Sequence, residues 1–406
     1  MKSTILQLTT AVLAVCLFCG SDWRQFRGND HRGVSAEKSL PVAFSETENV
    51  AWKVPLPGRG PSSPIVVAGR VVVTCSGGGR GDRLHVLCFD ANTGKLLWQR
   101  QLWATGHTAH HAFGALATPT PASDGRLIFA FYSTNDLACF DLDGNLQWFR
   151  GLSLDYPTAR NDVGMGSSPL ATGKTVVVQM ENQGESFAAG IDKATGETLW
   201  RVEREHDAIW ASPALLPGKT PDDDAVLLQG HSRLTAHHAY TGKLLWQFDA
   251  GCHSVASATT CDGVVYLPAT GLNALRADRA SGKVELLWRE NRLRSGNPSP
   301  TVHGGRVYTV KSPAILACGD ARTGNVLWQL RLKGTIWASP VLADGWLYCV
   351  SHEGLVQVVE PGEKEGRVIG ASQIDPAILA SPAVADGAIY FRSDRHLWKV
   401  ALPEQP

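Results

Sequence analysis

A tryptophan motif recurs along the chain at nearly constant spacing. Each copy joins a turn that ends in glycine, or in Gly-Asn, to a short run ending in tryptophan, as in "DANTGKLLW" (90–98) and "DKATGETLW" (192–200). The copies end at Trp98, Trp148, Trp200, Trp246, Trp288 and Trp328, at intervals of 50, 52, 46, 42 and 40 residues. Repeats of about 20–50 residues are typical of solenoids and propellers, in which each unit buries its apolar face against the next.

A second marker runs out of phase with the tryptophans. A serine or threonine followed by proline precedes a short apolar stretch at Ser63, Thr120, Ser168, Ser212, Ser299, Ser339 and Ser381. Ser257, in "SVASATT", fills the missing place without a proline. Together these markers divide the chain into eight units.

Each unit has the pattern of four short strands. Asp-Gly turns between apolar runs, as in "SDGRLIFAF" (123–131) and "ADGWLYCV" (343–350), indicate hairpins. No helical periodicity is found after the first residues of the chain. Four-stranded antiparallel units of this kind are the blades of β-propellers, so we predict an all-β, eight-bladed β-propeller.

The first strand of the propeller is predicted to close the ring. The eighth unit lacks a full fourth strand, and "VAWKVPL" (50–56) supplies one, with Trp52 in the tryptophan position. A closed ring leaves no strand edge free for aggregation. We therefore expect one propeller over residues 50–406, preceded by an extended segment at 22–49, with all seven motif tryptophans in a structural role between blades.

Residues 1–21 have the pattern of a signal peptide. Lys2 precedes an apolar run at 5–18, and small residues at Cys19 and Ser21 precede a cut before Asp22. The apolar run is too short for a transmembrane helix. A lipid anchor on Cys16 or Cys19 is the less favoured alternative, because a bulky residue precedes each. We predict an exported protein of the periplasm or cell envelope.

Charge and cysteine content exclude several classes of partner and site. The 38 basic and 38 acidic residues cancel, and a nucleic-acid or anionic-membrane partner would favour a basic surface. Seven cysteines follow residue 21, most of them inside apolar runs, which is typical of buried core positions. Cys252 and Cys261 are the one pair open to a disulfide. No CxxC pair is present, so a zinc site of that type has no support.

The repeated Asp-x-x-Thr-Gly-x-x-x-Trp pattern, with its Ser-Pro and Asp-Gly markers, resembles the PQQ-like (pyrroloquinoline-quinone) repeat over nearly the whole chain after residue 21. That family includes quinoprotein alcohol dehydrogenases and shorter members of the BamB type, which bind no quinone. The resemblance implies a quinone and calcium site only for the dehydrogenases. Their adjacent cysteine pair is missing here, and no calcium-ligand motif or catalytic aspartate can be matched. The chain is therefore most similar to the BamB-type members.

The polar residues of the loops before each first strand are expected to converge on one funnel. These loops lie nearest the propeller axis, and loops on a rigid scaffold commonly carry function. The cluster in "GHTAHHAFG" (106–114) belongs to one of them. The opposite face holds Asp-Gly and Thr-Gly turns, and no site is predicted there. The predicted funnel residues are His110, His111, Asn161, Asp162, Trp210, His253, Asn297 and Trp337.

The histidine cluster leaves three interpretations open. His107, His110 and His111 match no recognised metal-ligand spacing, so no metal site is predicted. The two other interpretations are that they make polar contacts to a ligand or that they form hydrogen bonds with neighbouring loops. The sequence favours a non-catalytic binding or scaffold protein, acting as a monomer without cofactor, with a protein or small-molecule partner at the funnel. Two alternatives remain: an oxidoreductase using PQQ and calcium, and a metal-dependent hydrolase.

Overall fold

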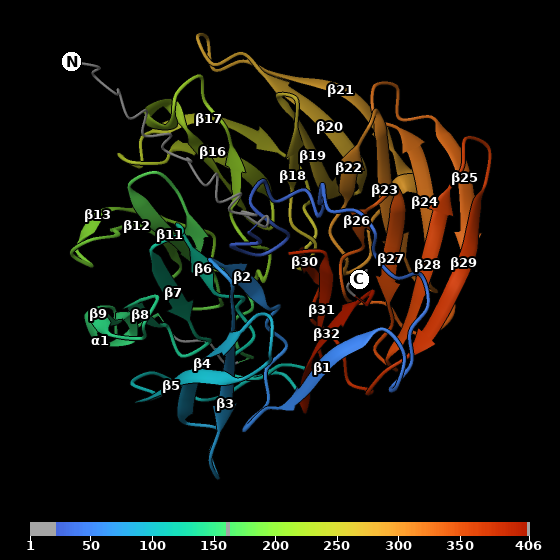
Figure 1. Cartoon of the computed structure of the whole chain (residues 1–406). Coiled ribbons are helices and arrows are strands. Elements are labelled where there is room, and N and C mark those ends of the chain that lie inside the picture. Colours follow the sequence, from blue (N-terminus) through green and yellow to red (C-terminus); the bar gives the residue numbers. More distant parts are fainter. Residues whose placement is uncertain (1–21, 160–162, 404–406) are drawn as a thin grey trace, which may run out of the picture.

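Eight four-stranded antiparallel sheets surround a central axis, as the sequence predicts (Figure 1). The structure is a computed structural model that describes residues 22–159 and 163–403. The predicted signal peptide, residues 1–21, lies outside this range. Within the described ranges the helices are α1 (Leu152–Asp155) and the 3-10 turns η1 (Pro221–Asp223) and η2 (Asn291–Leu293). No helix found there has the length and apolar character needed to cross a membrane.

The strands occupy four positions in each blade, from the axis outward. The innermost strands are β2 (Ile65–Val67), β6 (Ala122–Ser123), β10 (Leu170–Ala171), β14 (Ala214–Leu216), β18 (Thr259–Cys261), β22 (Thr301–His303), β26 (Val341–Ala343) and β30 (Ala383–Ala385). The second strands are β3 (Arg70–Gly77), β7 (Leu127–Phe131), β11 (Thr175–Met180), β15 (Ala225–Gln229), β19 (Val264–Ala269), β23 (Arg306–Lys311), β27 (Trp346–Val350) and β31 (Ala388–Arg392). The third strands are β4 (Arg83–Asp90), β8 (Asp136–Asp141), β12 (Phe187–Asp192), β16 (Arg233–His238), β20 (Gly271–Ala277), β24 (Ile315–Asp320), β28 (Leu355–Pro361) and β32 (His396–Ala401). The outermost strands are β5 (Leu96–Trp103), β9 (Leu146–Gly151), β13 (Thr198–Glu203), β17 (Leu244–Asp249), β21 (Val284–Glu290), β25 (Val326–Arg331), β29 (Gly366–Gln373) and β1 (Val50–Pro55).

The position of a strand in its blade decides its pattern of burial. The middle strands, such as β11 with "TVVVQM", are buried on both faces because another blade packs on each side. The outermost strands, such as β5 with "LLWQRQLW", alternate because one face meets water. The core therefore consists of layers between blades.

A β-bulge occurs in every blade, and in seven of the eight blades it lies beside the motif tryptophan. The third and outermost strands slip by one residue next to the tryptophan position, as between Cys88 and Phe89 opposite Trp98. The same irregularity occurs in all eight blades. Bulges bend a strand and redirect a side chain. Here the bulge accompanies a tryptophan that packs on the following blade.

The motif tryptophans contact neighbouring blades, at the positions where the sequence predicts a structural role for them. Trp98 is 9% exposed, and its indole N–H donates to the Leu142 carbonyl of the next blade at 2.9 Å. Its ring lies on Gly144, where a Cβ would come within 2.6 Å of the indole and where φ is 79°. Glycine is therefore required there by both space and backbone conformation. Equivalent N–H bonds start from Trp52, Trp148, Trp200, Trp288 and Trp328.

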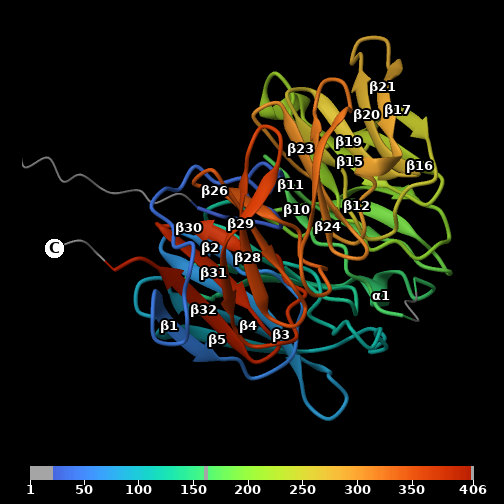
Figure 2. The same cartoon turned by 90° about the vertical axis from the view of Figure 1, so that its right-hand side faces the viewer.

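The N-terminal strand β1 completes the last blade, as predicted. Its sheet has the order β1-β32-β31-β30, and β1 pairs antiparallel with β32. Both views show blue β1 beside red β32 (Figure 1, Figure 2). The beginning and end of the propeller are thus held in one sheet.

Residues 22–35 line the central channel, where sequence reasoning placed nothing. Trp23 exchanges two backbone hydrogen bonds with Val66 of β2, and Val34 bridges Leu342 of β26 in parallel. The Arg24 carbonyl accepts from the Ser123 amide. Innermost strands carry unpaired N–H and C=O groups on their axial edge, and these groups need partners when they are buried. The segment supplies such partners to several blades.

The seven described cysteines are all free. Six are buried, the five predicted at core positions together with Cys252, and Cys261 is half-buried. Burial raises the pKa of thiols such as Cys88, Cys139 and Cys349 to about 12. The pair left open for a disulfide, Cys252 and Cys261, is not joined.

Candidate functional site

A funnel-shaped cavity of about 290 Å³ lies on the axis, and all eight connections between blades contribute to its wall. Each connection brings the residues just before an innermost strand to the axis, as the sequence predicted. The lining comprises aromatic and histidine side chains, small apolar residues, one asparagine and a set of hydroxyl groups. The cavity volume is near the lower end of the range of about 300–1,000 Å³ that is usual for small-molecule sites.

A closed belt of eight hydroxyl residues encircles the cavity. The backbone N–H of each belt residue donates to the side-chain hydroxyl of the belt residue in the next blade, at 2.9–3.0 Å. The last of these bonds runs from Ser381 back to Ser63 and closes the circle. In chain order the belt consists of Ser63, Thr120, Ser168, Ser212, Ser257, Ser299, Ser339 and Ser381. These are the marker residues of the sequence repeat.

The belt leaves eight hydroxyl hydrogens without an acceptor among the described residues. A hydroxyl group has one donor hydrogen and two acceptor positions. Each belt oxygen uses one acceptor position on a neighbouring amide, and its hydrogen has no protein partner in the described ranges. All eight residues line the cavity. A molecule in the funnel therefore meets a circle of hydrogen-bond donors.

The side of the cavity away from its mouth is bounded by the N-terminal segment. Phe26 lines the cavity there, and Arg27 follows it in the channel. Arg27 is 1% exposed, and its guanidinium donates to Thr259 Oγ1 at 2.6 Å and to the Pro300 carbonyl. Among the described residues no carboxylate pairs with it directly, and burial lowers the pKa of Arg27 to about 9. The segment is thus anchored deep in the ring, and the phenylalanine covers the cavity from beneath.

An aromatic cluster stands at the mouth of the funnel. The Phe113 side chain is 45% exposed, and its ring lies 5.7 Å from both the His111 and Trp337 rings, centroid to centroid. The His352 ring meets Phe113 edge-on at 5.9 Å. The loop that carries Phe113 is held by a 2.8 Å hydrogen bond from the His111 amide to the Val163 carbonyl. The mouth of the cavity therefore presents a partly exposed apolar surface.

Trp210 adds an apolar surface to the wall of the cavity, and Asn297 adds a polar one. The Trp210 indole N–H already donates to the Gly164 carbonyl at 2.8 Å, so its ring offers carbon surface to the cavity. The Asn297 amide lines the cavity, and no partner for it is found among the described residues. It can therefore both donate to and accept from a ligand.

Five of the eight predicted funnel residues line the cavity: His110, His111, Trp210, Asn297 and Trp337. Asn161 and Asp162 fall in the gap between the described ranges. His253 does not line the cavity, because its Nδ1 accepts from the Val255 and Ala256 amides at 3.1 Å and fixes the loop instead. Burial lowers the pKa of His253, which favours this neutral acceptor role.

Sequence reasoning missed the residues that give the funnel its chemistry. Phe113 lies beside the predicted histidines, but a single phenylalanine in a loop belongs to no repeat or motif that would mark it. The belt hydroxyls were used only as strand markers, although their recurrence at one position of every repeat was a usable signal. Phe26 precedes the propeller, and no sequence pattern connects it to the axis.

The described histidines form no metal site. No group of three or more His, Cys, Asp or Glu residues in the described ranges has the arrangement needed to hold a metal ion. Nδ1 of His110 lies 2.9 Å from the His111 carbonyl, and Nδ1 of His111 accepts from the Phe113 amide at 3.2 Å. These bonds leave each ring with one free nitrogen for a ligand.

The described lining does not fit pyrroloquinoline quinone. The quinone is a tricarboxylate, and its burial requires paired cations. No lysine or arginine lines the cavity among the described residues, and no acidic residue there could hold calcium. A neutral ligand suits these walls.

One partly buried arrangement contains serine, aspartate and histidine but is not a catalytic triad. Asp375 contacts both His396 Nδ1 and the Ser393 hydroxyl. The Ser393 oxygen accepts from two backbone amides and does not reach a ring nitrogen of His396. A nucleophilic serine needs that contact with its base, so the group lacks the geometry of a hydrolase.

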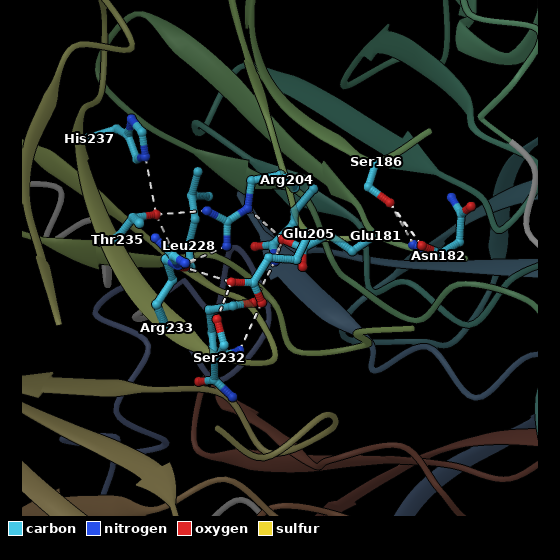
Figure 3. A network of polar contacts seen from close by, with 12 residues as sticks. Glu181, Asn182, Ser186, Arg204, Glu205, Leu228, Ser232, Arg233, Thr235 and His237 are labelled. Carbon is cyan, nitrogen blue, oxygen red and sulfur yellow. Dashed lines mark hydrogen bonds and ion pairs between the residues drawn. The ribbon is translucent and has the colours of Figure 1, made fainter. Parts of the chain in front are cut away.

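A buried polar network behind the funnel wall joins the third and fourth blades (Figure 3). The Arg204 guanidinium pairs with Glu181 and donates to Thr235 Oγ1 at 2.8 Å and to the Leu228 carbonyl at 3.2 Å. The side chain of Glu181 is completely buried, and burial raises its pKa to about 7 against the opposing effect of Arg204. Glu181 also bridges Ile209, the neighbour of Trp210. The network therefore supports the wall of the funnel.

The profile of the family described as outer membrane protein assembly factor BamB matches residues 28–163, 158–259 and 273–369. The chain belongs to this family. It is 24% identical over 317 residues to the outer membrane protein assembly factor BamB of Yersinia pestis, covering 71% of this chain and 72% of that protein.

Two solved structures show the same fold. BamB from Moraxella catarrhalis superposes with a TM-score of 0.64 at 17% identity, covering 88% of this chain and 98% of its own. The quinohemoprotein alcohol dehydrogenase from Comamonas testosteroni has a TM-score of 0.67 at 12% identity, covering 95% and 81%. An assembly factor and an oxidoreductase are thus both similar to this chain in fold, and fold alone does not decide between their functions.

Proposed function

We propose that this protein is a non-catalytic binding or scaffold protein of the cell envelope that takes its partner at the mouth of the axial funnel. Its family is described as an outer membrane protein assembly factor, and the apolar pattern of residues 5–18 supports export. The observation that carries the proposal is the funnel itself. It presents exposed aromatic rings and free hydrogen-bond donors, while no catalytic constellation is found in the described lining.

The arrangement of the mouth supports binding of a molecule or a short protruding segment. Phe113 and Trp337 come from connections three blades apart and meet over the cavity. A ligand that contacts both rings also contacts the loops that hold them. Because this surface is already formed before binding, little conformational entropy is lost when the ligand binds. Such a site suits recognition and needs no reacting group.

The test compares binding and turnover in the same samples. The purified protein is screened by thermal unfolding against peptides, saccharides, and PQQ with calcium. We expect a ligand that raises the unfolding temperature and is recovered chemically unchanged. A Phe113→Ala/Trp337→Ala variant should lose this shift, whereas Trp103→Ala, which removes a 59% exposed tryptophan outside the cavity, should keep it. A product formed by wild type and lost in the double variant would overturn the proposal, as would quinone binding followed by dye reduction.

A further inference from the structure

We infer that the funnel binds a neutral saccharide, seated on the aromatic cluster and hydrogen-bonded to the hydroxyl belt. This inference rests on the proposed binding function and names the ligand class for the same cavity. It starts from the combination of two surfaces in one small space. One is the apolar wall formed by Phe26, Phe113, Trp210 and Trp337, and the other is the belt.

The belt requires a ligand with several hydrogen-bond acceptors. Its hydroxyl hydrogens point to no protein acceptor among the described residues, and leaving a buried donor unpaired costs about 1–3 kcal/mol. An apolar side chain that filled the funnel would displace water from these hydroxyl groups and would provide no hydrogen-bond acceptor for them. A pyranose carries oxygen atoms around its whole edge, and each can accept from a hydroxyl and donate to another group.

The aromatic rings require an apolar face on the same ligand. The faces of a pyranose ring expose C–H groups, which pack on tryptophan and phenylalanine rings. Trp210 presents carbon surface because its N–H is occupied by Gly164 at 2.8 Å. Phe113 and Trp337, tilted by 39° to each other, offer two further ring faces at the mouth. The free Asn297 amide lies in the same wall and can bond to a hydroxyl of the sugar.

The chemistry of the described lining favours a neutral sugar. No lysine, arginine, aspartate or glutamate lines it among the described residues. A carboxylated or phosphorylated sugar would lose its hydration there without gaining an ion pair. The volume of about 290 Å³ limits the buried part to a short saccharide or to the end of a longer one that leaves through the mouth.

The test is a calorimetric and tryptophan-fluorescence titration of the purified protein with glucose, N-acetylglucosamine, maltose and chitobiose, and with glucuronate as the charged counterpart. We expect saturable binding of at least one neutral sugar. Glucuronate should bind at least about tenfold more weakly, and Trp337→Ala should lose at least about tenfold in affinity, which corresponds to about 1.4 kcal/mol. The Trp103→Ala variant should bind like wild type.

The belt is tested by a matched pair of variants. Ser339→Ala removes one hydroxyl from the belt, and Ser339→Thr keeps it, as the hydroxyl of Thr120 does at its own belt position. We expect weaker sugar binding in the alanine variant alone. Titrations that show no saturable binding of any neutral sugar, or equal binding by wild type and Trp337→Ala, would overturn the inference.

The outcomes separate this inference from the proposed function. A peptide that binds in place of sugars and is lost in Trp337→Ala contradicts the saccharide and leaves the binding function intact. Conversion of a bound sugar into a product contradicts the non-catalytic function and keeps the ligand class.

Discussion

Neighbouring blades are joined twice, by tryptophans near the rim and by hydroxyl groups at the axis. The rim contacts bury large aromatic surfaces, but they are not the same in all eight blades. Trp246 has no hydrogen-bond partner for its buried N–H among the described residues, and β29 carries no tryptophan. The axial belt has no interruption, since all eight positions bear a hydroxyl and all eight hydrogen bonds form.

This difference shows what each contact contributes. A tryptophan stabilises its own pair of blades through buried area, so the loss of one leaves the other pairs unchanged. A belt hydroxyl accepts from a neighbouring amide and also faces the cavity. The rim tryptophans therefore join blades away from the cavity, whereas each belt hydroxyl both joins two blades and lines the cavity.

The largest effect is expected from truncating a rim tryptophan. Trp200 is 7% exposed, donates to the Ala239 carbonyl at 3.1 Å and covers Gly242. Trp200→Ala should lower the free energy of unfolding by about 3–5 kcal/mol, measured by urea denaturation. The exposed Trp103 is the control, and Trp103→Ala should change stability by less than about 0.5 kcal/mol. Equal losses in both variants would contradict the assigned role of the rim.

The Glu181 network predicts a pH dependence of stability. The pKa of Glu181 is raised to about 7 in the folded protein by burial, so between pH 4.5 and 7 the folded state holds a proton that the unfolded state releases. Stability should therefore fall as pH rises through this window, by about 3 kcal/mol relative to Glu181→Gln.

Unfolding of wild type and Glu181→Gln at several pH values measures this difference. Glutamine keeps a side-chain oxygen that can accept from Arg204, and it does not titrate. The difference between the two proteins therefore reports the protonation of the Glu181 carboxyl group. A wild type that instead gains stability over the variant as pH rises would show that pairing with Arg204 outweighs burial.

A belt hydroxyl should contribute less to stability than a rim tryptophan. Ser212→Ala leaves the buried Ser168 amide without its acceptor at 2.9 Å, and the expected loss is about 1–3 kcal/mol in denaturant unfolding. Ser212→Thr restores the oxygen and should recover most of this loss. If the threonine variant is no more stable than the alanine variant, the hydrogen bond is not the source of the effect.

The smallest effect concerns the irregular rim position. Trp200→Phe removes an indole N–H that is bonded, and Trp246→Phe removes one that has no partner in the described ranges. Both keep an aromatic ring, so the first should cost about 1 kcal/mol more than the second. Thermal or urea unfolding of the two variants measures the difference, and the reverse order would show that Trp246 has the stronger contact.

Much of the fold could be predicted because its signals are local and repeated. The Asp-Gly turns, the glycine that precedes six of the rim tryptophans and the Ser-Pro or Thr-Pro markers each act within a few residues, and their repetition along the chain reinforces the pattern. The funnel loops were predicted for the same reason, since strand order alone brings His110, His111 and Trp337 to one face. The closure by β1 followed from a missing strand in the last unit.

The tertiary structure decided everything that depends on contacts between unlike segments. The eightfold spacing of blades places each marker hydroxyl within 2.9–3.0 Å of a neighbouring amide, a distance that no single repeat encodes. Phe26 reaches the axis because residues 22–35 pair with free inner strand edges. Phe113 meets Trp337 across the mouth although more than two hundred residues separate them in the chain. Sequence periodicity determined the ring, whereas only the tertiary structure decided how its repeated hydroxyls and the non-repeated Phe26, Phe113 and Trp337 come together around the cavity, because these contacts join segments far apart in the chain.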